Sequence, residues 1–403
     1  MKNVTILGST GTIGENTLNV IAGFPSKFNV FALTANKSIE KLYRQVLDWR
    51  PRYAVLSCTN SAKILSDKLK SHSAIKTEVI GGPESLQFVA AHEETDYVMA
   101  AIVGGAGLLS SMSAARHGKR ILLANKESLV MSGELFMNEV KNSGSQLLPI
   151  DSEHNAIFQC LPFDYGSPKS SSSASITKLI LTGSGGPFLN TSAEKLSDIS
   201  VEQACNHPNW VMGQKISIDS ATMMNKVFEV IEAKKIFNVS LNKIKVFSHP
   251  ESYVHAIVKF KNGLTKILIH DTNMKIPIFN SLFNQNEKIK SDKLNIKKLN
   301  NLNLKIINKN QFPSLNLIKY FSSKNNSLLE TVLVSANDEL VDLFLKNKIK
   351  YLDITKNLLN VLKLKEFKRL RLKKPINLAQ IIRLNKYVRL KTRSLCVRSS
   401  DNV

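Results

Sequence analysis

Two carboxylates stand close together in the stretch LLPIDSEHNAIF (147–158), where an apolar run favouring a β-strand leads into Asp151 and Glu153. On a strand, residues two apart point the same way about 7 Å apart, so both should face one place. His154 should then point away from Glu153, as a packed or capping histidine. Oxygen ligands without histidine or cysteine partners suit Mg²⁺ or Mn²⁺ rather than zinc. The pair therefore predicts a divalent metal site, the alternative being a solvated or capping pair at a strand end.

A third metal ligand is expected from DSATMMNKVFEVIEAKKIF (219–237), which has the pattern of a single helix. Asn225 and Lys226 share one face of that helix with Glu229. Glu232 lies one turn further along and is the rival ligand. On the residues alone, both glutamates remain candidates.

Residues of the kinds that bind phosphate accompany the carboxylates in the sequence. A phosphate site commonly combines one point charge with several neutral hydrogen-bond donors. The residues of these types are Ser184 in the stretch TGSGG, Ser220, Asn225 and Lys226. They predict a phosphorylated small-molecule substrate, although TGSGG alone would equally suit a flexible turn.

A glycine-rich stretch, GSTGTIG (8–14), follows the first expected strand and opens a helix. Glycines there let backbone N–H groups approach a pyrophosphate at the positive end of the helix. The spacing differs from the strict dinucleotide fingerprint, so a purely structural turn is the alternative. The second expected strand ends in ANKS, without the acidic residue usual for NAD. Lys37 and Ser38 can instead hold a 2′-phosphate, which favours NADPH.

The first 150 residues alternate β-rich runs with helical stretches, which predicts a mostly parallel sheet covered by helices. The expected strands are residues 3–8, 29–35, 52–57, 77–82, 97–104, 120–125 and 146–151. The α/β chain should thus begin with a Rossmann-like nucleotide domain.

Beyond residue 150 the pattern changes. We expect a Ser-rich loop at 166–175, a strand running into a glycine loop at 176–188, a hairpin at 252–269, and helices from 312 onward. The predicted domains are an NADPH-binding domain at 1–150 and an α+β catalytic domain at 151–285, which binds metal and substrate and has a flexible flap. A linker at 286–311 and a helical domain at 312–403 follow.

The chain has a net charge of +23, and residues 286–403 hold 26 Lys and Arg against nine Asp and Glu. These charges are scattered among Leu and Ile at helical spacing rather than blocked together with Gly and aromatic residues. We therefore expect solvated helix faces in an AT-biased coding sequence rather than a specific nucleic-acid partner.

The remaining composition predicts a cytoplasmic protein without a membrane partner. The chain opens on a strand-like run rather than a signal peptide, and no run of 18 apolar residues is present. The four cysteines have no metal or disulfide spacing and are expected to be reduced thiols.

Several long motifs resemble one enzyme family, 1-deoxy-D-xylulose 5-phosphate reductoisomerase, in order from residue 1 to about 270. They are GSTGTIG, AAIVGGAGL, LLANKESLV, LLPIDSEHNAIFQ, LTGSGGPF, HPNWVMGQKISIDSATMMNK and FEVIEA. The resemblance implies an NADPH-dependent oxidoreductase of the non-mevalonate isoprenoid pathway. Such enzymes isomerise and reduce 1-deoxy-D-xylulose 5-phosphate to 2-C-methyl-D-erythritol 4-phosphate, and they are homodimers with nucleotide, catalytic and C-terminal helical domains.

The resemblance also implies roles for individual residues, and it selects Glu229 over Glu232. The implied metal ligands are Asp151, Glu153 and Glu229. The implied catalytic residues are Lys126, Asp151, Glu153, Glu229 and His207. The implied substrate contacts are Lys126, Ser152, Glu153, Ser184, His207, Ser220, Asn225, Lys226 and Glu229. The implied NADPH contacts are Thr10, Gly11, Thr12, Ile13, Lys37, Ser38, Asn125, Glu127 and Gly213. Trp210 and Met212 fall on a closing flap.

This chain departs from the family pattern at a few places. Asn36 replaces a glycine beside Lys37, HDTNMK (270–275) replaces G-x-P-D-M-R, and beyond residue 286 the clearest match is SANDE (335–339). Two other functions are weighed against the resemblance: a phospho-sugar dehydrogenase without isomerisation, and a basic binding module without catalysis. A retro-aldol route and a ketol shift are both compatible with the residues.

The ANKS loop generates a prediction about the cofactor. NADPH should be preferred over NADH. Lys37→Ala should weaken the binding of NADPH roughly tenfold, because a hydrogen bond to a charged group contributes about 1.5–3 kcal/mol. Steady-state kcat/KM for the two nucleotides measures this. Equal efficiency with both nucleotides in the unaltered protein would contradict the prediction.

Overall fold

The computed structural model describes residues 1–162, 175–283, 287–321 and 327–400, so most of the predicted Ser-rich loop lies outside the described residues. The chain divides into two units. The first comprises residues 1–128, 136–151 and 274–290, and the second comprises 129–135, 152–273 and 291–403. The fourfold domain division expected from the sequence stays a prediction.

The first unit is built on a seven-stranded, wholly parallel sheet in the order β4-β3-β2-β1-β5-β6-β7. Its strands are β1 (Lys2–Leu7), β2 (Phe28–Ala35), β3 (Tyr53–Leu56), β4 (Glu78–Gly81), β5 (Tyr97–Ala100), β6 (Arg120–Leu123) and β7 (Gln146–Pro149). All seven predicted strands are confirmed, although several end earlier than predicted. The inner strands are apolar because strands buried on both faces have no solvent-facing side, whereas the edge strands β4 and β7 are only partly buried.

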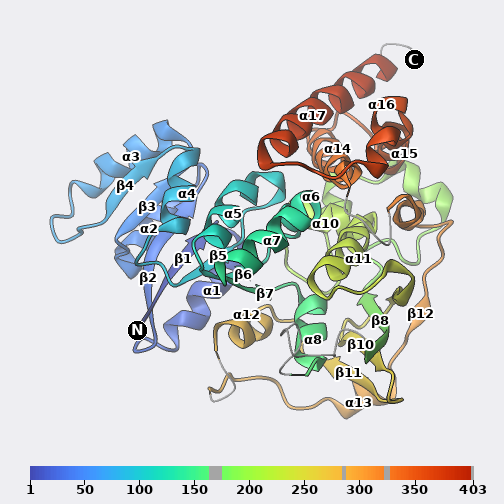
Figure 1. The fold of residues 1–403 in the computed structure, drawn as a ribbon, viewed down its shortest axis with the longest axis horizontal. Helices are drawn as coiled ribbons and strands as arrows, with labels where there is room; N and C mark the ends of the chain where they lie inside the picture. Colours follow the sequence, from blue (N-terminus) through green and yellow to red (C-terminus); the bar gives the residue numbers. More distant parts are fainter. Residues whose placement is uncertain (163–174, 284–286, 322–326, 401–403) are drawn as a thin grey trace. The chain divides into compact units, whose positions relative to one another are not determined.

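Helices cover the sheet of the first unit (Figure 1). They are α1 (Thr12–Ala22), α2 (Ile39–Trp49), α3 (Thr59–Leu69), α4 (Pro83–Ala91), the 3₁₀ helix η1 (Gly104–Gly107), α5 (Leu108–Arg116), α7 (Glu134–Ser143) and α12 (Lys275–Leu282), with α6 (Lys126–Ser132) crossing the boundary between units. One hydrophobic core joins strand residues to α1, α2, α3 and α12. Helices α4 and α5 pack on each other. Both belong to crossovers that run toward β7, and right-handed crossovers in one direction place their helices on the same face of the sheet.

The strand order reverses at β1, which is where ligands bind in open sheets of this type. The glycine loop follows β1 directly and leads into α1. Gly8 has a φ of +84°, and a Cβ there would lie 2.8 Å from the Ala101 carbonyl oxygen. A Cβ on Gly14 would lie 2.4 Å from the Ser9 Cα. Only glycine at these two positions lets helix, loop and strand approach so closely.

The second unit contains a five-stranded mixed sheet in the order β11-β10-β8-β9-β12. Its strands are β8 (Ile176–Gly183), β9 (Ile244–Ser248), β10 (Val254–Phe260), β11 (Thr265–Ile269) and β12 (Lys305–Ile306). Strands β10 and β11 form the predicted hairpin. The sheet's core includes buried residues of α8 (Ser152–Cys160) and α11 (Met224–Ile236), the two helices that carry most of the candidate metal ligands.

Shorter elements and a group of helices complete the second unit. The shorter ones are η3 (Ala193–Asp198), α9 (Val201–Cys205), α10 (Gln214–Ala221), η4 (Leu241–Lys243), α13 (Ile296–Asn300) and η5 (Pro313–Tyr320). The C-terminal group is α14 (Leu328–Leu345), α15 (Tyr351–Lys363), α16 (Lys365–Lys368), η6 (Arg369–Leu372) and α17 (Leu378–Ser400). Helix α14 is buried along nearly its whole length, and α15 and α17 pack against it (Figure 1). The prediction of helices from residue 312 onward is confirmed for residues 312–321 and 327–400. Among the residues that the structure describes, no helix combines the length and apolar character needed to cross a bilayer.

Two local predictions are wrong. The strand β7 ends at Pro149 and a helix, α8, begins at Ser152, so Asp151 and Glu153 do not share a strand. Ser152 and Glu153 form the first turn of a helix, where acidic residues are favoured by the helix dipole. The single helix expected over 219–237 is two helices, α10 and α11, separated at Met223, which has a φ of +61°.

Two buried charges join α11 to α14. Lys235 Nζ lies 2.6 Å from Glu330 Oε2 and donates to the carbonyl oxygens of Val130 at 2.7 Å and Leu129 at 3.3 Å. Both side chains are 2% exposed. Burial lowers the pKa of Lys235, an effect that the carboxylate of Glu330 opposes. The pair therefore depends on both partners being present.

Removing one partner of this pair should be costly. Glu330→Gln removes the hydrogen-bonded countercharge of a buried ammonium and leaves it only the coulombic attraction of Glu232, so we expect a loss of about 3–5 kcal/mol in the free energy of unfolding. Urea unfolding followed by circular dichroism measures this. The matched control is Glu134→Gln, because Glu134 pairs with Lys374 at 3.2 Å with both side chains exposed; it should cost at most about 1 kcal/mol. Equal losses in the two variants would contradict the argument.

Candidate active site

Two glutamates from different helices of the second unit meet around one lysine. Glu153 lies in the first turn of α8, and Glu229 lies in the middle of α11. Lys226 Nζ lies 2.9 and 2.7 Å from the two carboxylate oxygens of Glu229 and also donates to Glu153 Oε1. Asn225 Nδ2 donates to Glu229 Oε1 at 2.5 Å, and Ser152 Oγ donates to Glu153 Oε2 at 2.5 Å. The carboxylates are thus held by one ammonium group and two neutral donors.

Asp151 adds a third carboxylate, directly before α8. Its oxygen and those of Glu153 and Glu229 all lie within 4.8 Å of one another. Lys126 Nζ donates to Asp151 Oδ1 at 3.0 Å and is 4% exposed. Three hard oxygen donors at this spacing fit Mg²⁺, which is bound through carboxylates and is small enough for the space between them. The predicted metal ligands are therefore close enough to share one ion.

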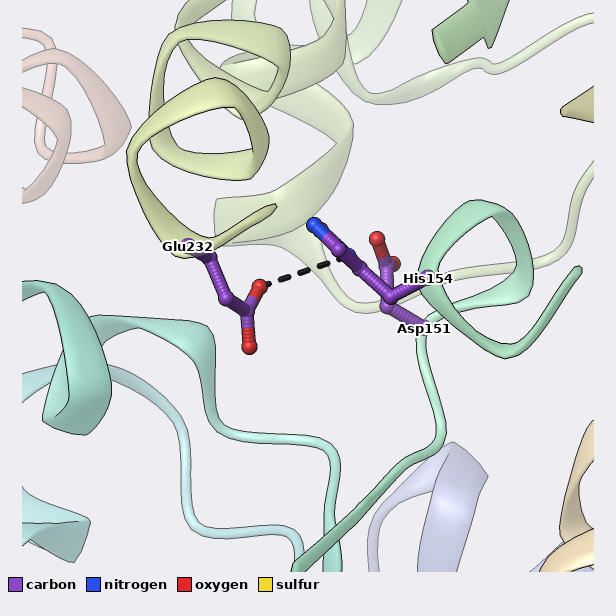
Figure 2. A group of neighbouring side chains, drawn as sticks. All are labelled: Asp151, His154 and Glu232. Carbon is purple, nitrogen blue, oxygen red and sulfur yellow. Dashed lines mark ion pairs between the residues drawn. The ribbon is translucent and has the colours of Figure 1, made fainter. Parts of the chain in front are cut away.

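A second group of potential ligands lies beside the first. Figure 2 shows the side chains of Asp151, His154 and Glu232, whose potential ligand atoms also lie within 4.8 Å of one another. His154 Nε2 lies 3.0 Å from the Glu229 carbonyl oxygen, so this nitrogen carries a proton. His154 Nδ1 lies 3.5 Å from Glu232 Oε2, and both side chains are buried. His154 is therefore a packed histidine, as predicted, and its hydrogen bond supports the backbone that carries Glu229.

Chemistry favours the all-carboxylate group for magnesium. Imidazole nitrogen suits Zn²⁺, Cu²⁺, Fe²⁺ or Ni²⁺, whereas carboxylate oxygen suits Mg²⁺. Glu232 is also one turn before Lys235, whose pKa its negative charge raises. The carboxylate of Glu232 thus already counters a buried cation of α11. The residues alone left Glu229 and Glu232 open, and the donor types support Glu229.

The candidate phosphate residues lie on three neighbouring segments of the second unit. Ser184 follows β8, Ser220 is the second-last residue of α10, and Lys226 is in the first turn of α11. A Cβ at Gly183 would lie 2.7 Å from Lys226 Cε, and a Cβ at Gly186 would lie 2.9 Å from the Ser220 carbonyl oxygen. The glycines of TGSGG let the Ser184 loop lie directly against the other two residues. This packing role was missed, although the glycine spacing was a usable signal.

His207 sets the direction of the Ser184 hydroxyl. The backbone N–H groups of Trp210 and Asn209 donate to His207 Nδ1 at 3.0 and 3.2 Å, so the ring proton is on Nε2. Nε2 then donates to Ser184 Oγ at 2.9 Å, and the Gly186 N–H donates to the same oxygen at 3.0 Å. With two hydrogen bonds accepted, the Ser184 hydroxyl keeps its own proton to donate to a ligand.

The predicted loop at 207–213 is confirmed, since no helix or strand is found between α9 and α10. The Trp210 ring meets His255 edge to face at a centroid distance of 6.2 Å, and His255 stacks on His270 at 3.6 Å. Met212 is half-buried, Gly213 is exposed, and Val211 is 91% exposed. The loop is thus anchored at His207 and Trp210 and open to solvent beyond them.

The predicted nucleotide residues of the first unit lie at the ends of its strands. Thr10, Gly11, Thr12 and Ile13 join β1 to α1, and the exposed Lys37 and Ser38 lie between β2 and α2. Asn36 Oδ1 accepts from Ser57 Oγ at 2.8 Å, so this departure from the family pattern ties the loop to the end of β3.

Asn125 and Glu127, predicted to contact NADPH, are buried at the start of α6. Asn125 Nδ2 donates to the carbonyl oxygens of Ile102 and Gly104, and Asn125 Oδ1 accepts from the Ser128 N–H at 2.7 Å. The side chain of Asn125 therefore holds the loop after β5 and begins α6. Any cofactor contact by Asn125 must coexist with these bonds.

Comparison with known proteins decides the family. Three family models match this chain. The model of 1-deoxy-D-xylulose 5-phosphate reductoisomerase matches residues 4–133, and the model of the C-terminal domain of that enzyme matches 147–237. A second C-terminal domain model, of DXP reductoisomerase, matches 270–391. A relative of that name from Pelagibacter ubique is 44% identical over 399 residues, covering 98% of this chain and 100% of the relative. One from Haemophilus influenzae is 43% identical over 365 residues, covering 88% and 90%. This chain belongs to the 1-deoxy-D-xylulose 5-phosphate reductoisomerase family.

Solved structures agree with this membership of the reductoisomerase family. A crystal structure of DOX-P reductoisomerase in complex with NADPH, fosmidomycin and magnesium has a TM-score of 0.93 and 38% identity, covering 98% of each chain. The match includes residues beyond 286, where the sequence motifs were weakest. The predicted fold class, a Rossmann-like nucleotide domain, an α+β catalytic domain and a helical C-terminal domain, is confirmed.

The ionisation of His207 gives a prediction for this reductoisomerase family member. Burial, with a smaller contribution from Lys226, lowers the pKa of His207 to about 4. Because the folded pKa lies below the unfolded value of about 6.5, the folded chain binds fewer protons between these values. The contribution to stability is complete above about pH 6.5 and is lost as the pH falls toward 4.

Proton NMR of the ring measures this directly, with the signal assigned by its absence in a His207→Gln variant. The His207 ring should titrate with a midpoint near 4 and keep its Nε2 proton at neutral pH. A midpoint near 6.5, the value for a free imidazole, would show that the ring is not held as described.

Proposed function

We propose that this chain performs the reaction of its family through the residues assembled around Lys226. The reaction is the NADPH-dependent isomerisation and reduction of 1-deoxy-D-xylulose 5-phosphate to 2-C-methyl-D-erythritol 4-phosphate, in the non-mevalonate route to isoprenoid precursors. The observation that carries the residue assignment is the meeting of Glu153 and Glu229 around one lysine, next to Asp151. The cofactors are NADPH and Mg²⁺, as in the solved relative, and Mn²⁺ is proposed as a substitute.

Asp151, Glu153 and Glu229 would hold the divalent cation. When bound, the metal polarises the substrate carbonyl and counters negative charge that develops during the rearrangement. Lys126 and Ser152 are proposed to orient the substrate hydroxyls. Lys126 is buried beside Asp151, so its ammonium group is held in place before the substrate arrives. Preorganisation of this kind reduces the reorganisation needed in the transition state.

Ser184, Ser220, Asn225 and Lys226 are proposed to bind the substrate phosphate, with His207 supporting Ser184. The Ser184 proton is available because His207 and Gly186 already donate to its oxygen. The buried position of Lys226 strengthens its attraction for an anion. Binding energy from the phosphate, which does not react, can then assist the chemistry at the other end of the substrate.

NADPH is proposed to bind along the glycine loop at Thr10, Gly11, Thr12 and Ile13, with further contacts from Lys37, Ser38, Asn125, Glu127 and Gly213. We further propose that 1–150 binds NADPH, that 151–285 is catalytic, and that 286–311 links it to the helical part at 312–403. Trp210 and Met212 belong to a flap that closes over the substrate and excludes water. We also propose a cytoplasmic homodimer.

The proposed reaction is tested by incubating the purified chain with 1-deoxy-D-xylulose 5-phosphate, NADPH and Mg²⁺. Loss of absorbance at the nicotinamide band should accompany formation of the branched phosphate product, identified by mass and NMR. Oxidation of NADPH with an unbranched sugar-alcohol product would indicate a simple dehydrogenase instead. Omission of the metal should abolish turnover.

The ligand assignment predicts different outcomes for two glutamates on one helix. Glu229→Gln should reduce turnover at least 10³-fold and weaken Mg²⁺ binding, because a carboxylate ligand is replaced by a neutral amide. Glu232→Gln should keep turnover within about tenfold, which makes it the matched control. Asp151→Asn and Glu153→Gln should behave like Glu229→Gln.

Turnover and Mg²⁺ titration, with melting temperatures for each variant, separate ligand loss from unfolding. An inactive, folded Glu232→Gln beside an active Glu229→Gln would reverse the assignment and favour the group of Asp151, His154 and Glu232.

A further inference from the structure

Segment 219–222 is the end of α10 and its C-cap residue, and Met223 links it to α11. The two helices carry different parts of the proposed phosphate site. Ser220 is near the end of α10, while Asn225 and Lys226 are in the first turn of α11. Between them, Met223 takes a left-handed conformation with a φ of +61°. A bulky residue rarely adopts that conformation unless its surroundings impose it. Something must therefore hold the segment in place.

Three polar side chains from the C-terminal part of the second unit bond to this segment. The Tyr351 hydroxyl donates to the Ala221 carbonyl oxygen at 2.7 Å, and Ser314 Oγ donates to the Thr222 carbonyl oxygen at 2.5 Å. Asn337 Nδ2 donates to Asp219 Oδ1 at 2.7 Å. All three side chains are buried, with exposures of 6%, 0% and 0% for Tyr351, Ser314 and Asn337.

These bonds meet a specific need of the backbone. The last carbonyl groups of a helix have no partner within the helix. At the end of α10 two of them are buried, and a buried carbonyl without a partner costs about 1–3 kcal/mol. Tyr351 and Ser314 supply those partners. Burial raises the pKa of Tyr351, so its hydroxyl remains a donor at every pH at which an enzyme works.

The TGSGG loop, which carries Ser184, packs directly against the same backbone. A Cβ at Gly186 would lie 2.9 Å from the Ser220 carbonyl oxygen and 3.0 Å from Ala221 Cα. The loop that carries Ser184 is therefore in contact with residues 220–221. Movement of that backbone would displace Ser220 directly and would change the packing of Gly186, two residues from Ser184.

We propose that Tyr351 and Ser314 are positioning residues for the substrate phosphate, holding segment 219–222 so that Ser184, Ser220 and Lys226 donate to one anion. The inference rests on the phosphate site described under the proposed function. Neither residue touches the substrate. Their effect passes through the carbonyl oxygens of Ala221 and Thr222.

The test compares Tyr351→Phe and Ser314→Ala with the unaltered full-length chain. Each variant should raise the KM for the phosphorylated substrate roughly five- to tenfold and raise the inhibition constant of inorganic phosphate in parallel. The kcat should fall by less than the KM rises, because only part of the phosphate binding energy assists the chemistry, and the KM for NADPH should not change. Ser314→Thr, which keeps the hydroxyl, should restore the KM.

Matched controls remove hydroxyl groups elsewhere. Tyr387→Phe removes a bond to Glu366, and Ser335→Ala removes a buried bond to the Thr331 carbonyl oxygen. Neither should alter the KM or phosphate inhibition. Melting temperatures of all variants exclude general unfolding. The inference is overturned if Tyr351→Phe and Ser314→Ala leave both constants unchanged, or if kcat, both KM values and the melting temperature all deteriorate together.

Ser184→Ala and Ser220→Ala distinguish failure of the inference from failure of the proposed site. If these two variants weaken phosphate inhibition while Tyr351→Phe and Ser314→Ala do not, the site stands and the positioning role is wrong. If Ser184→Ala and Ser220→Ala leave phosphate inhibition unchanged, the phosphate site itself is misassigned, and the positioning role is then wrong as well.

Discussion

The site depends on keeping several carboxylates close together inside the protein. Isolated buried carboxylates are strongly disfavoured, because they lose their hydration and repel one another. Glu229 is 0% exposed and is tolerated because Lys226 and Asn225, on the same helix, both bond to it. Lys226 also donates to Glu153 on α8, and Lys126 donates to Asp151. Each carboxylate is therefore compensated by a nearby donor before any ligand is considered, and the lysines that compensate them are also well suited to bind a phosphorylated substrate.

The compensation places strict demands on the backbone. Lys226 can reach both glutamates only if its aliphatic stem passes close to the end of β8, where Gly183 leaves room for it. The Ser184 loop can lie against α10 only because Gly186 has no side chain. The left-handed backbone at Met223 then separates the end of α10 from the start of α11. The sequence TGSGG and the break between helices are thus two consequences of bringing charged side chains to one point.

Much of this could be predicted from the sequence, for identifiable reasons. The seven parallel strands were predictable because strands buried on both faces are short continuous apolar runs. Helix α8 was missed, although Asp151-Ser152-Glu153 before an apolar run is an N-terminal helix signal; the apolar residues 147–150 before it favoured extending the strand. The break at Met223 was not predictable. No glycine or proline marks it, and it is stabilised by Tyr351 and Ser314, which are far away in the sequence. The residue types identified the candidate metal and phosphate ligands, but not the contacts that hold them.

The difference between buried polar contacts and surface charges explains how the C-terminal part can be so basic without disturbing the site. Its link to segment 219–222 runs through three buried polar side chains, Ser314, Asn337 and Tyr351. Other charges in this part pair at the surface: Lys346 Nζ lies 2.7 Å from Asp342 Oδ2, and the two side chains are 60% and 33% exposed. Exposed pairs contribute little to stability, so additional lysines and arginines on these helices have little energetic consequence. Substitution of Tyr351 or Ser314 would instead remove the side-chain donor to the carbonyl oxygen of Ala221 or Thr222. Substitution of Asn337 would leave the Asp219 carboxylate with Lys215 but without its amide donor. The constraint that the site imposes on the C-terminal part is therefore concentrated in a few buried polar residues, while its surface charge is free to vary.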